Sequence, residues 1–339
     1  MSSEAKILWI DNLRAISCVM VIALHVTGHW LTKLQGVSIS VWSSITLFHI
    51  LTRFCVPVFL MITGALLLNK KNTAVDFYKK RLSRVLKPFA FWTLFYLIVH
   101  FIFEYLQGGK VVFKEALSYS INALFSGAAY HMWYIYLIVA IYLIIPVFFN
   151  LNGRVFKIIQ PVFLIIWLMV LVLAQLNEGN SFLVFMRSSI GYLGYVILGS
   201  FLNELVIERD KSIWIGISLI FISLMWTFLP VYNFYIEHNI VYDGWFYFLK
   251  ANIAILSSGI FILFKNIKLE NPIMLELSKH SFGIYFIHLI YFMILNKVIP
   301  MDSMPFFIYL AFIISSTLIL SYLSIRLLLK IPVLNKYIE

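Results

Sequence analysis

The sequence predicts an all-α, polytopic membrane protein with about ten transmembrane helices and with both termini in the cytoplasm. Three observations lead to this fold class. Hydrophobic residues make up 62% of the 339 residues, and charged residues make up 12%. The mean hydropathy is +0.93, which exceeds what the core of a water-soluble domain needs. The apolar residues also gather in stretches of roughly 20 residues, the length that crosses a bilayer.

Each of these stretches is expected to form one transmembrane helix. In chain order the expected spans are Leu8–Leu31, Val41–Leu68, Leu86–Phe103, Met132–Phe149, Ile158–Leu176, Ile190–Ile207, Ile213–Val231, Trp245–Phe264, Phe282–Ile299 and Phe306–Leu329. Tryptophans near several span ends fit an aromatic belt at the membrane surface. The connection Glu104–Tyr130 holds a semi-apolar stretch, Val111–Phe125, which is expected to lie along the membrane or fold back into it.

Lysine and arginine in the connections predict which side of the membrane each connection faces. The connection after the second span is the most basic, with Lys70, Lys71, Lys79, Lys80, Arg81, Arg84 and Lys87. The connection after the eighth span adds Lys265, Lys268 and Lys279. The connection Tyr232–Gly244 has no lysine or arginine. Because basic loops stay in the cytoplasm, the even-numbered connections and both termini are expected there.

The formal net charge of +11 does not indicate a nucleic-acid partner, because most of the excess lies in these short connections. That placement fits orientation in the membrane and contact with acidic lipid, so a lipid bilayer is the expected partner. The two cysteines, Cys18 and Cys55, lie in apolar stretches without metal-ligand spacing. We therefore expect both to be packing residues, and we expect no bound metal.

The first span carries two side chains that are costly to expose to lipid, Arg14 and His25. Eleven residues at 100° each come to about 20° from three full turns, so both side chains lie on one helix face. They are roughly 16 Å apart along the helix axis. This face is expected to line a protein interior or an aqueous cavity. The simpler structural alternatives are that Arg14 pairs with Asp11 or extends to the inner headgroups.

The segment around this pair, "LRAISCVMVIALH", resembles the first span of the acyltransferase family 3 membrane proteins. Four later segments resemble that family in the same order: "RFCVPVFLMITGALLLNK", "YKKRLSRVLKPF", "HMWYIYLIVAIYLIIPVF" and "LSKHSFGIYFIHLI". The residues that carry these matches are Pro57, Phe59, Thr63, Gly64, Arg81, Arg84, Pro88, His131, Trp133, Ser281, Tyr285 and His288. The ordered set covers nearly the whole chain, from residue 8 to about residue 300.

The resemblance implies a single integral membrane acyltransferase domain over residues 1–339, of the stand-alone O-acetyltransferase type, in the cytoplasmic (inner) cell membrane. Such a protein moves an acyl group, usually acetyl, from cytoplasmic acyl-CoA to a hydroxyl of an extracytoplasmic or lipid-linked glycan. Acetyl-CoA, or another acyl-CoA, would then be the donor substrate. No permanently bound cofactor is expected.

For this chemistry, His25 is the expected general base, because imidazole is the side chain best suited to proton transfer near neutral pH. Alternatively, His25 accepts the acyl group itself and passes it to the sugar. Ser281, Tyr285 and His288 form a polar stripe at i, i+4 and i+7, with His288 as a second functional histidine. Ser281, Tyr285 or Arg53 would stabilise the carbonyl oxygen.

The donor is expected to meet cations near the inner face. Arg14, Arg81 and Arg84 would contact the phosphates of CoA, and the last two share a face if their segment is helical. Arg53 lies deep in the second span, as a further donor-binding residue or as part of a structural ion pair between helices.

Residues near the outer surface are candidates for acceptor binding. His131 and Trp133 open the fourth span, where a sugar could stack on the indole ring. Lys250 in the eighth span has no expected partner. The other histidines are interpreted as interfacial or incidental: His29, His49, His100, His238 and His280.

Two other classes of protein fit parts of the pattern. A secondary transporter or a flippase for a lipid-linked sugar also keeps ionisable residues around a central cavity. Against this alternative, the sequence has no pair of spans broken by Gly or Pro at matching positions of two halves. A membrane-anchored sensor or scaffold would not need a buried face with Arg14 and His25. An enzyme consumes acyl-CoA, whereas a transporter ignores it.

The charge distribution gives a testable topology. Cysteine labelling or reporter fusions should place the Asn69–Lys87 connection in the cytoplasm and the Tyr232–Gly244 connection outside, because basic loops are retained inside. Labelling of both connections from the same side of the membrane would contradict the number of spans between them.

Overall fold

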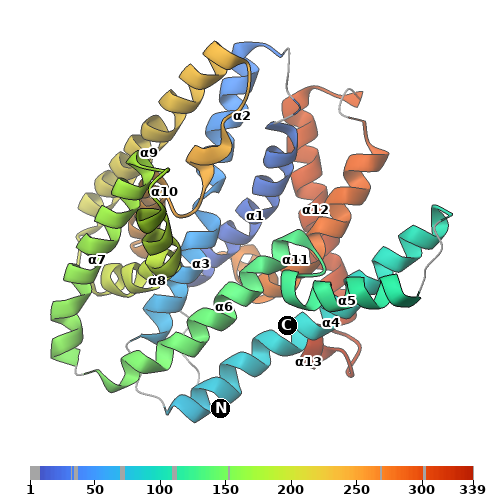
Figure 1. Cartoon of the computed structure of the whole chain (residues 1–339), viewed down its shortest axis with the longest axis horizontal. Coiled ribbons are helices and arrows are strands. Elements are labelled where there is room, and N and C mark those ends of the chain that lie inside the picture. The colour runs from blue at the N-terminus through green and yellow to red at the C-terminus, as the bar shows by residue number, and fades with distance from the viewer. Residues whose placement is uncertain are drawn as a thin grey trace.

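The computed structural model describes residues 8–31, 33, 37–68, 73–108, 113–151, 153–267, 269–300 and 303–338. Within these residues, ten helical segments are long and apolar enough to cross a membrane, which confirms the predicted fold class (Figure 1). The helices are α1 Leu8–Leu31, α2 Ile39–Thr52, α3 Cys55–Leu67, α4 Ala74–Leu106, α5 Phe113–Ser126, α6 Trp133–Ile144, α7 Gly153–Leu176, α8 Ser181–Glu204, α9 Arg209–His238, α10 Ala251–Lys265, α11 Pro272–Val298, α12 Phe306–Leu328 and α13 Asn335–Ile338. Three 3₁₀ helices join them, η1 Tyr130–Met132, η2 Ile145–Asn150 and η3 Asp243–Phe246.

Helix α1 lies at the centre of the bundle. It packs against α2, α3, α10, α11 and α12, and Figure 1 shows it between α2 and α3 on one side and α11 and α12 on the other. Its bounds are those expected for the first span. This central position keeps the face that carries Arg14 and His25 away from lipid, as the cost of exposing those side chains requires.

The span expected near Val41–Leu68 is present as Ile39–Leu67, but it consists of two helices instead of one continuous helix. Helix α2 ends at Thr52 and α3 begins at Cys55. The Arg53 amide N–H bonds to the Ile50 carbonyl at 3.0 Å, a tightened final turn. Pro57 explains the break, because its ring lacks an N–H and would clash with the carbonyl four residues earlier in a continuous helix.

Two helices begin earlier than their hydrophobic stretches predict, because a capping residue starts each one. At α4, the Asp76 amide donates to Thr73 Oγ1 at 3.2 Å and the Thr73 hydroxyl donates to the Asp76 carboxylate at 2.6 Å. At α11, Asn271 Oδ1 accepts the Ile273 amide at 2.9 Å, with Pro272 as the first helical residue. Much of the basic segment expected to be a connection is therefore helical. Lys70, Lys71 and Lys268 lie outside the described residues.

The eighth span also differs from its prediction. It begins as η3 and an extended segment, and α10 starts only at Ala251. Lys250 is therefore the residue before α10, and it is buried. Its ammonium bonds to the carboxylate of Glu178, which also accepts the Tyr242 hydroxyl at 2.9 Å. The hydrogen bond from Lys250 lowers the pKa of Glu178, so the carboxylate stays charged opposite the buried cation.

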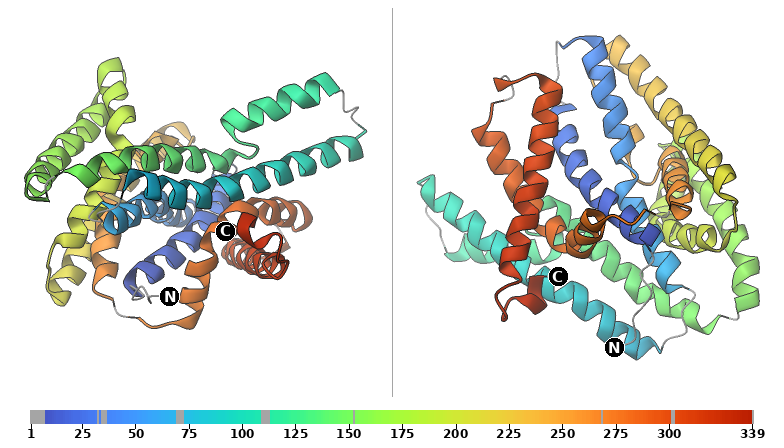
Figure 2. Two further views of the ribbon diagram at one scale, coloured as in Figure 1. Left: turned by 90° about the horizontal axis from the view of Figure 1, so that it is seen from below. Right: turned by 180° about the vertical axis from the view of Figure 1, so that it is seen from behind.

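The connections that follow the third and seventh spans contain more helix than expected. Helix α9 continues to His238, so the connection that follows it is shorter than the predicted 232–244. Helix α5 occupies most of the semi-apolar stretch, whose residues 111 and 112 lie outside the described residues. His100 on α4 stacks on Tyr119 of α5, with ring centroids 4.0 Å apart. Together α5 and the end of α4 project from the bundle (Figure 2).

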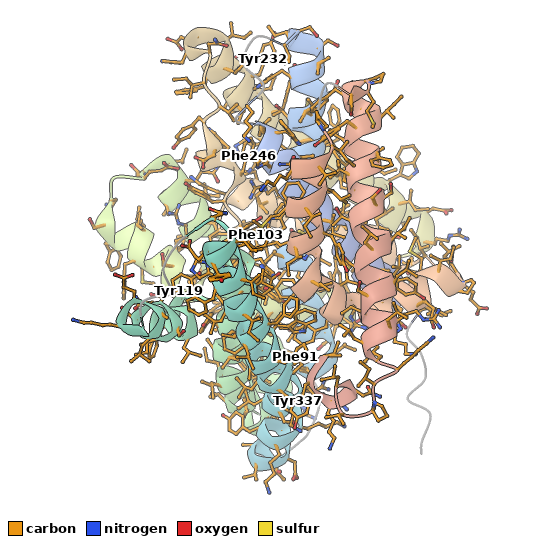
Figure 3. All side chains as sticks on the ribbon, turned by 90° about the vertical axis from the view of Figure 1, so that its right-hand side faces the viewer. Phe91, Phe103, Tyr119, Tyr232, Phe246 and Tyr337 are labelled. Atoms are coloured by element: carbon orange, nitrogen blue, oxygen red, sulfur yellow. The ribbon has the colours of Figure 1, made fainter. Side chains whose placement is uncertain are left out.

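The projecting pair of helices is apolar on its outer side. Phe103 of α4 and Tyr119 of α5, labelled in Figure 3, are 48% and 38% exposed. Exposed aromatic and aliphatic side chains of this kind suit lipid or the membrane interface.

Small residues allow α3 and α8 to cross closely. A Cβ added to Gly64 would lie 1.7 Å from the Val196 carbonyl oxygen, and one added to Gly199 would lie 2.0 Å from the Met61 carbonyl oxygen. Close approach at glycine is a common way for membrane helices to gain packing contacts. The crossing holds α3 in place, and α3 forms one wall of the cavity described below.

This crossing can be tested by substitution. Gly199→Ala should lower the melting temperature of the detergent-solubilised protein, since the new methyl group collides with backbone and overpacking costs about 1–3 kcal/mol. Gly153→Ala is the matched control, because a Cβ there meets nothing within 4 Å. Equal melting temperatures for the two variants would contradict the close crossing.

Candidate active site

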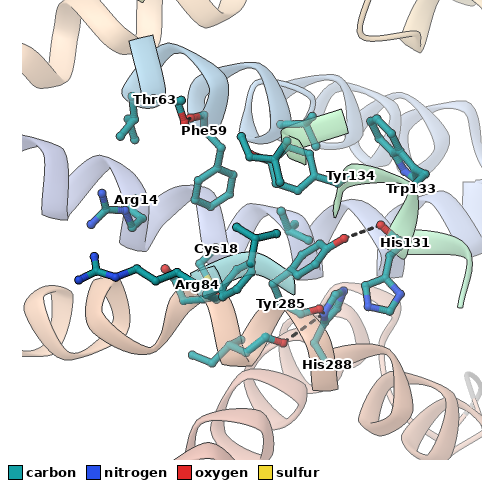
Figure 4. A pocket seen from close by; sticks show the side chains of 18 of the residues that line it. Arg14, Cys18, Phe59, Thr63, Arg84, His131, Trp133, Tyr134, Tyr285 and His288 are labelled. Carbon is teal, nitrogen blue, oxygen red and sulfur yellow. Dashed lines mark hydrogen bonds between the residues drawn. The ribbon is translucent and has the colours of Figure 1, made fainter. Parts of the chain in front are cut away.

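A cavity of about 390 Å³ lies between α1, α3, α4, α6 and α11. Its volume is within the range of sites that bind small molecules. All predicted site residues except Arg53 line it: Arg14, His25, Arg81, Arg84, His131, Trp133, Ser281, Tyr285 and His288. Figure 4 shows Arg14 and Arg84 at one end, His131 and His288 at the other, and Phe59 and Tyr134 between them. The tertiary structure thus brings together five segments that are far apart in the sequence.

Arg14 lies at the basic end of the cavity and is held by two neighbours. Its Nη1 is 3.3 Å from Asp11 Oδ1 and 3.3 Å from Ser278 Oγ. The Ser278 hydroxyl in turn donates to Asp11 at 2.8 Å. The pairing with Asp11 that the sequence offered as a structural alternative is therefore present. Since Arg14 also lines the cavity, this pairing orients the guanidinium group and leaves it open to a ligand.

Three further cations lie at the same end: Arg81 and Arg84 from α4 and Lys279 from α11. Among the described residues, none of the three has an ion-pair or hydrogen-bond partner. Cations without an internal counter-charge suit an anionic ligand such as phosphate. From the sequence, Lys279 was expected only in a connection. Asn271 followed by Pro272 is a helix-start signal, and it could have shown that Lys279 belongs to the cavity-lining helix α11.

Three histidines gather at the opposite end. His25 of α1 and His288 of α11 have ring centroids 5.2 Å apart at 29° between planes. His131 of η1 meets His288 edge to face at 5.3 Å. His131 and His288 are 2% and 0% exposed. Arg14 and His25 therefore share one face of α1, as their spacing predicts, and that face joins the basic end to the histidine end.

Hydrogen bonds fix part of the arrangement of these rings. His288 Nδ1 lies 2.7 Å from the Tyr285 carbonyl oxygen and 3.3 Å from that of Ile284. His288 Nε2 and both ring nitrogens of His131 have no partner among the described residues. His25 Nδ1 lies 3.1 Å from the hydroxyl oxygen of Tyr130. Tyr130 was missed in the sequence because it precedes the fourth span, although it directly adjoins His131.

Two of the groups predicted to stabilise the substrate carbonyl, Ser281 and Tyr285, already donate their hydroxyl hydrogens to backbone carbonyl oxygens. The Ser281 hydroxyl donates to the Ser278 carbonyl at 2.8 Å. The Tyr285 hydroxyl donates to the His131 carbonyl at 2.5 Å, as drawn in Figure 4. Each would have to break this bond before it could donate to a substrate, which lowers its value as a preorganised donor.

Arg53 does not line the cavity. It donates to His49 Nε2 at 2.6 Å, and its guanidinium lies over the rings of Phe246 and Phe248 at 5.4 and 5.6 Å. Because Nε2 accepts, His49 donates through Nδ1 to Thr27 Oγ1 at 2.8 Å. His49 is buried in the bundle, so its interpretation as interfacial is wrong. Arg53 supports the wall behind Phe248, and a role in donor binding stays a prediction.

Aromatic side chains connect the two ends. The hydroxyl groups of Tyr134 and Tyr142 line the cavity and have no hydrogen-bond partner among the described residues. Trp133 packs between Phe248 and Tyr192, at centroid distances of 6.0 and 5.9 Å. Within the described chain, no group of three His, Cys, Asp or Glu residues has the arrangement of a metal site.

The fold and the cavity together define a multi-pass membrane protein whose cavity has a basic end and a buried histidine end. The acyltransferase family 3 model, described as an acyltransferase domain, matches residues 7–326. The chain therefore belongs to acyltransferase family 3 and is a membrane acyltransferase, which confirms the resemblance carried by the ordered segments. No curated protein and no solved structure matches the chain.

Proposed function

We propose that this protein transfers an acyl group, acetyl in the first instance, from cytoplasmic acyl-CoA to a hydroxyl of an extracytoplasmic or lipid-linked glycan. It would act in the cytoplasmic membrane, as an O-acetyltransferase. The membrane fold and the family membership support acyl transfer. The choice of donor and acceptor is our proposal.

The cavity's two chemically different ends carry the proposal. Acyl-CoA has an anionic nucleotide at one end, a long flexible arm with amide groups, and a thioester at the other end. Arg81, Arg84 and Lys279 offer unpaired positive charge to the phosphates. The hydroxyls of Tyr134 and Tyr142 are free to meet the amides of the arm. The thioester would then reach the histidines, roughly 16 Å farther along α1.

At the histidine end, transfer requires that the acceptor hydroxyl lose its proton as its oxygen attacks the thioester carbon. His25 serves this reaction in one of two ways. In the direct route it assists the attack of the sugar on the thioester. In the relay route a nitrogen of His25 first accepts the acyl group, with release of the CoA thiol, and the sugar then attacks acyl-His25. The crowding of three imidazole rings favours a short acyl group such as acetyl.

The acceptor is proposed to approach from the side of Tyr130 and Trp133. Tyr130 is 61% exposed and contacts the ring of His25, so it lies where the histidine end meets the protein surface. An aromatic ring such as the indole of Trp133 can stack on a sugar, and His131 lies two residues before it. A glycan hydroxyl entering here would meet His25 without passing the basic end.

The first test concerns His25. His25→Ala should abolish acyl-CoA-dependent acylation of the glycan, because both routes lose the imidazole that acts at the acyl group, and losing one such group typically costs 10²–10⁴-fold. The measurement is acyl transfer by membranes that contain equal amounts of each variant. Activity within a few-fold of wild type would rule out the proposed role. A transporter would leave acyl-CoA unconsumed in every variant, wild type included.

The second test concerns the basic end. Neutralising Arg81, Arg84 or Lys279 with glutamine should weaken acyl-CoA binding about ten- to a hundredfold, because a charge-assisted contact is worth roughly 1.5–3 kcal/mol. Arg81→Lys should be milder than Arg81→Gln, since lysine keeps the charge but loses the planar fork. Arg14→Gln should be the most damaging change, because it also leaves the Asp11 carboxylate without its cation.

The measurement for this test is the affinity of purified protein for acyl-CoA, together with turnover. Lys297→Gln is the matched control for Lys279→Gln, since it lies near the other end of α11 and is not a cavity residue. Wild-type affinity in all of the cavity variants would show that the donor does not enter at this end.

A further inference from the structure

The proton positions on His288 can be assigned from its hydrogen bonds alone. Its Nδ1 faces two backbone carbonyl oxygens, at 2.7 Å for Tyr285 and 3.3 Å for Ile284. A carbonyl oxygen only accepts, so Nδ1 must carry the hydrogen. In the neutral ring Nε2 is then a bare lone pair. A backbone carbonyl thus fixes the tautomer of His288, in the way that a carboxylate does in many catalytic triads.

This lone pair has no hydrogen-bond partner in the part of the chain that the structure describes. His288 is fully buried, and its Nε2 makes no hydrogen bond to any described residue. A buried acceptor without a partner is unfavourable, so it is expected where a ligand supplies the missing donor. The rings around it belong to His25, His131 and Tyr285. All three line the same cavity as His288.

The other groups at this end do not offer an equally defined base. The hydroxyls of Ser281 and Tyr285 donate to carbonyl oxygens. His25 Nδ1 bonds to a tyrosine hydroxyl, which can donate or accept, so either nitrogen of His25 can carry its hydrogen. The backbone of Tyr285 and Phe286 lies beside the His131 ring, but neither ring nitrogen makes a well-formed hydrogen bond to a described residue that would set the tautomer. Only for His288, among the described residues of this end, do the contacts decide which nitrogen is basic.

We propose that His288 Nε2 is the general base that takes the proton of the acceptor hydroxyl, an assignment that rests on the proposed acyl transfer. As the O–H proton moves to Nε2, the acceptor oxygen forms a bond to the acyl carbon. In the direct route the C–S bond breaks, and the proton passes from His288 to the CoA thiolate. In the relay route the bond from the acyl carbon to His25 breaks, and the proton passes to the released nitrogen of His25. His25 is then free to contact the acyl group itself.

Asparagine separates this role from a structural one. The side-chain amide N–H of asparagine lies close to the position of histidine Nδ1–H. His288→Asn therefore keeps the bond to the Tyr285 carbonyl and removes Nε2 together with the outer edge of the ring. His288→Leu removes both. His100→Asn is the matched control, because His100 lies on the projecting part of α4, stacked on Tyr119 and outside the cavity.

The experiment compares turnover, KM for acetyl-CoA and melting temperature for the purified full-length variants, with glycan-bearing membranes as acceptor. We expect His288→Asn to reduce kcat by 10²–10⁴-fold, with KM for acetyl-CoA within a few-fold of wild type and an unchanged melting temperature. Free imidazole should restore part of the turnover of His288→Ala. His100→Asn should behave as wild type.

Two results would overturn the assignment. Turnover of His288→Asn within tenfold of wild type, with only His288→Leu impaired, would show that the Nδ1 bond is the sole contribution of His288. A large rise in KM for acetyl-CoA with unchanged kcat would place His288 in donor binding instead. If wild-type protein consumes no acetyl-CoA, the proposed function fails, and that failure is distinct because it does not depend on any His288 variant.

Discussion

The interior of a bilayer offers no water to hydrogen-bond with polar groups, and this constraint decides where α1 can lie. A helix that carries a guanidinium and an imidazole on one face must turn that face toward protein. The bundle satisfies this by surrounding α1 with five other helices. Asp11 of α1 and Ser278 of α11 bond to Arg14, so its guanidinium group has polar partners within the protein. The cavity is the space left beside this polar face.

Local signals at helix ends then determine what else reaches the cavity. The Thr73 and Asn271 caps extend α4 and α11 beyond their apolar stretches. These extensions carry Arg81, Arg84 and Lys279 to the basic end. Pro57 interrupts the helix of the second span. Arg53, at this break, packs against Phe248 in the cavity wall instead of lining the cavity. Glycines at the crossing of α3 and α8 bring the backbones close enough to fix the wall that α3 provides.

Along α1, the cavity keeps its cationic side chains and its histidines at opposite ends. At one end lie Arg14 and three cations that have no ion-pair partner among the described residues, and at the other end lie buried imidazoles with nitrogens that no described residue bonds. His288 is oriented by backbone carbonyls of its own helix, α11. In such a buried setting each hydrogen bond counts for more than it would in water.

Much about this protein was determined by the sequence alone. Hydropathy predicted the all-α membrane fold and the number of spans, since span length is set by bilayer thickness. The period of the helix predicted that Arg14 and His25 share a face. The ordered segments indicated the family, which the match to residues 7–326 confirmed. The same resemblance indicated the candidate site residues, and all of them except Arg53 line the cavity.

Only the tertiary structure decided how these residues meet and which of their atoms are available. Arg53 and Arg14 read alike in the sequence as arginines inside spans, yet one pairs with His49 outside the cavity and the other lines it. Ser281 and Tyr285 looked like free donors, but their protons are already bonded to carbonyl oxygens. Lys250 appeared unpaired until the fold placed Glu178 beside it. Sequence periodicity defines positions along one helix, whereas hydrogen-bond partners come from other helices, so their identity is fixed only when the helices pack.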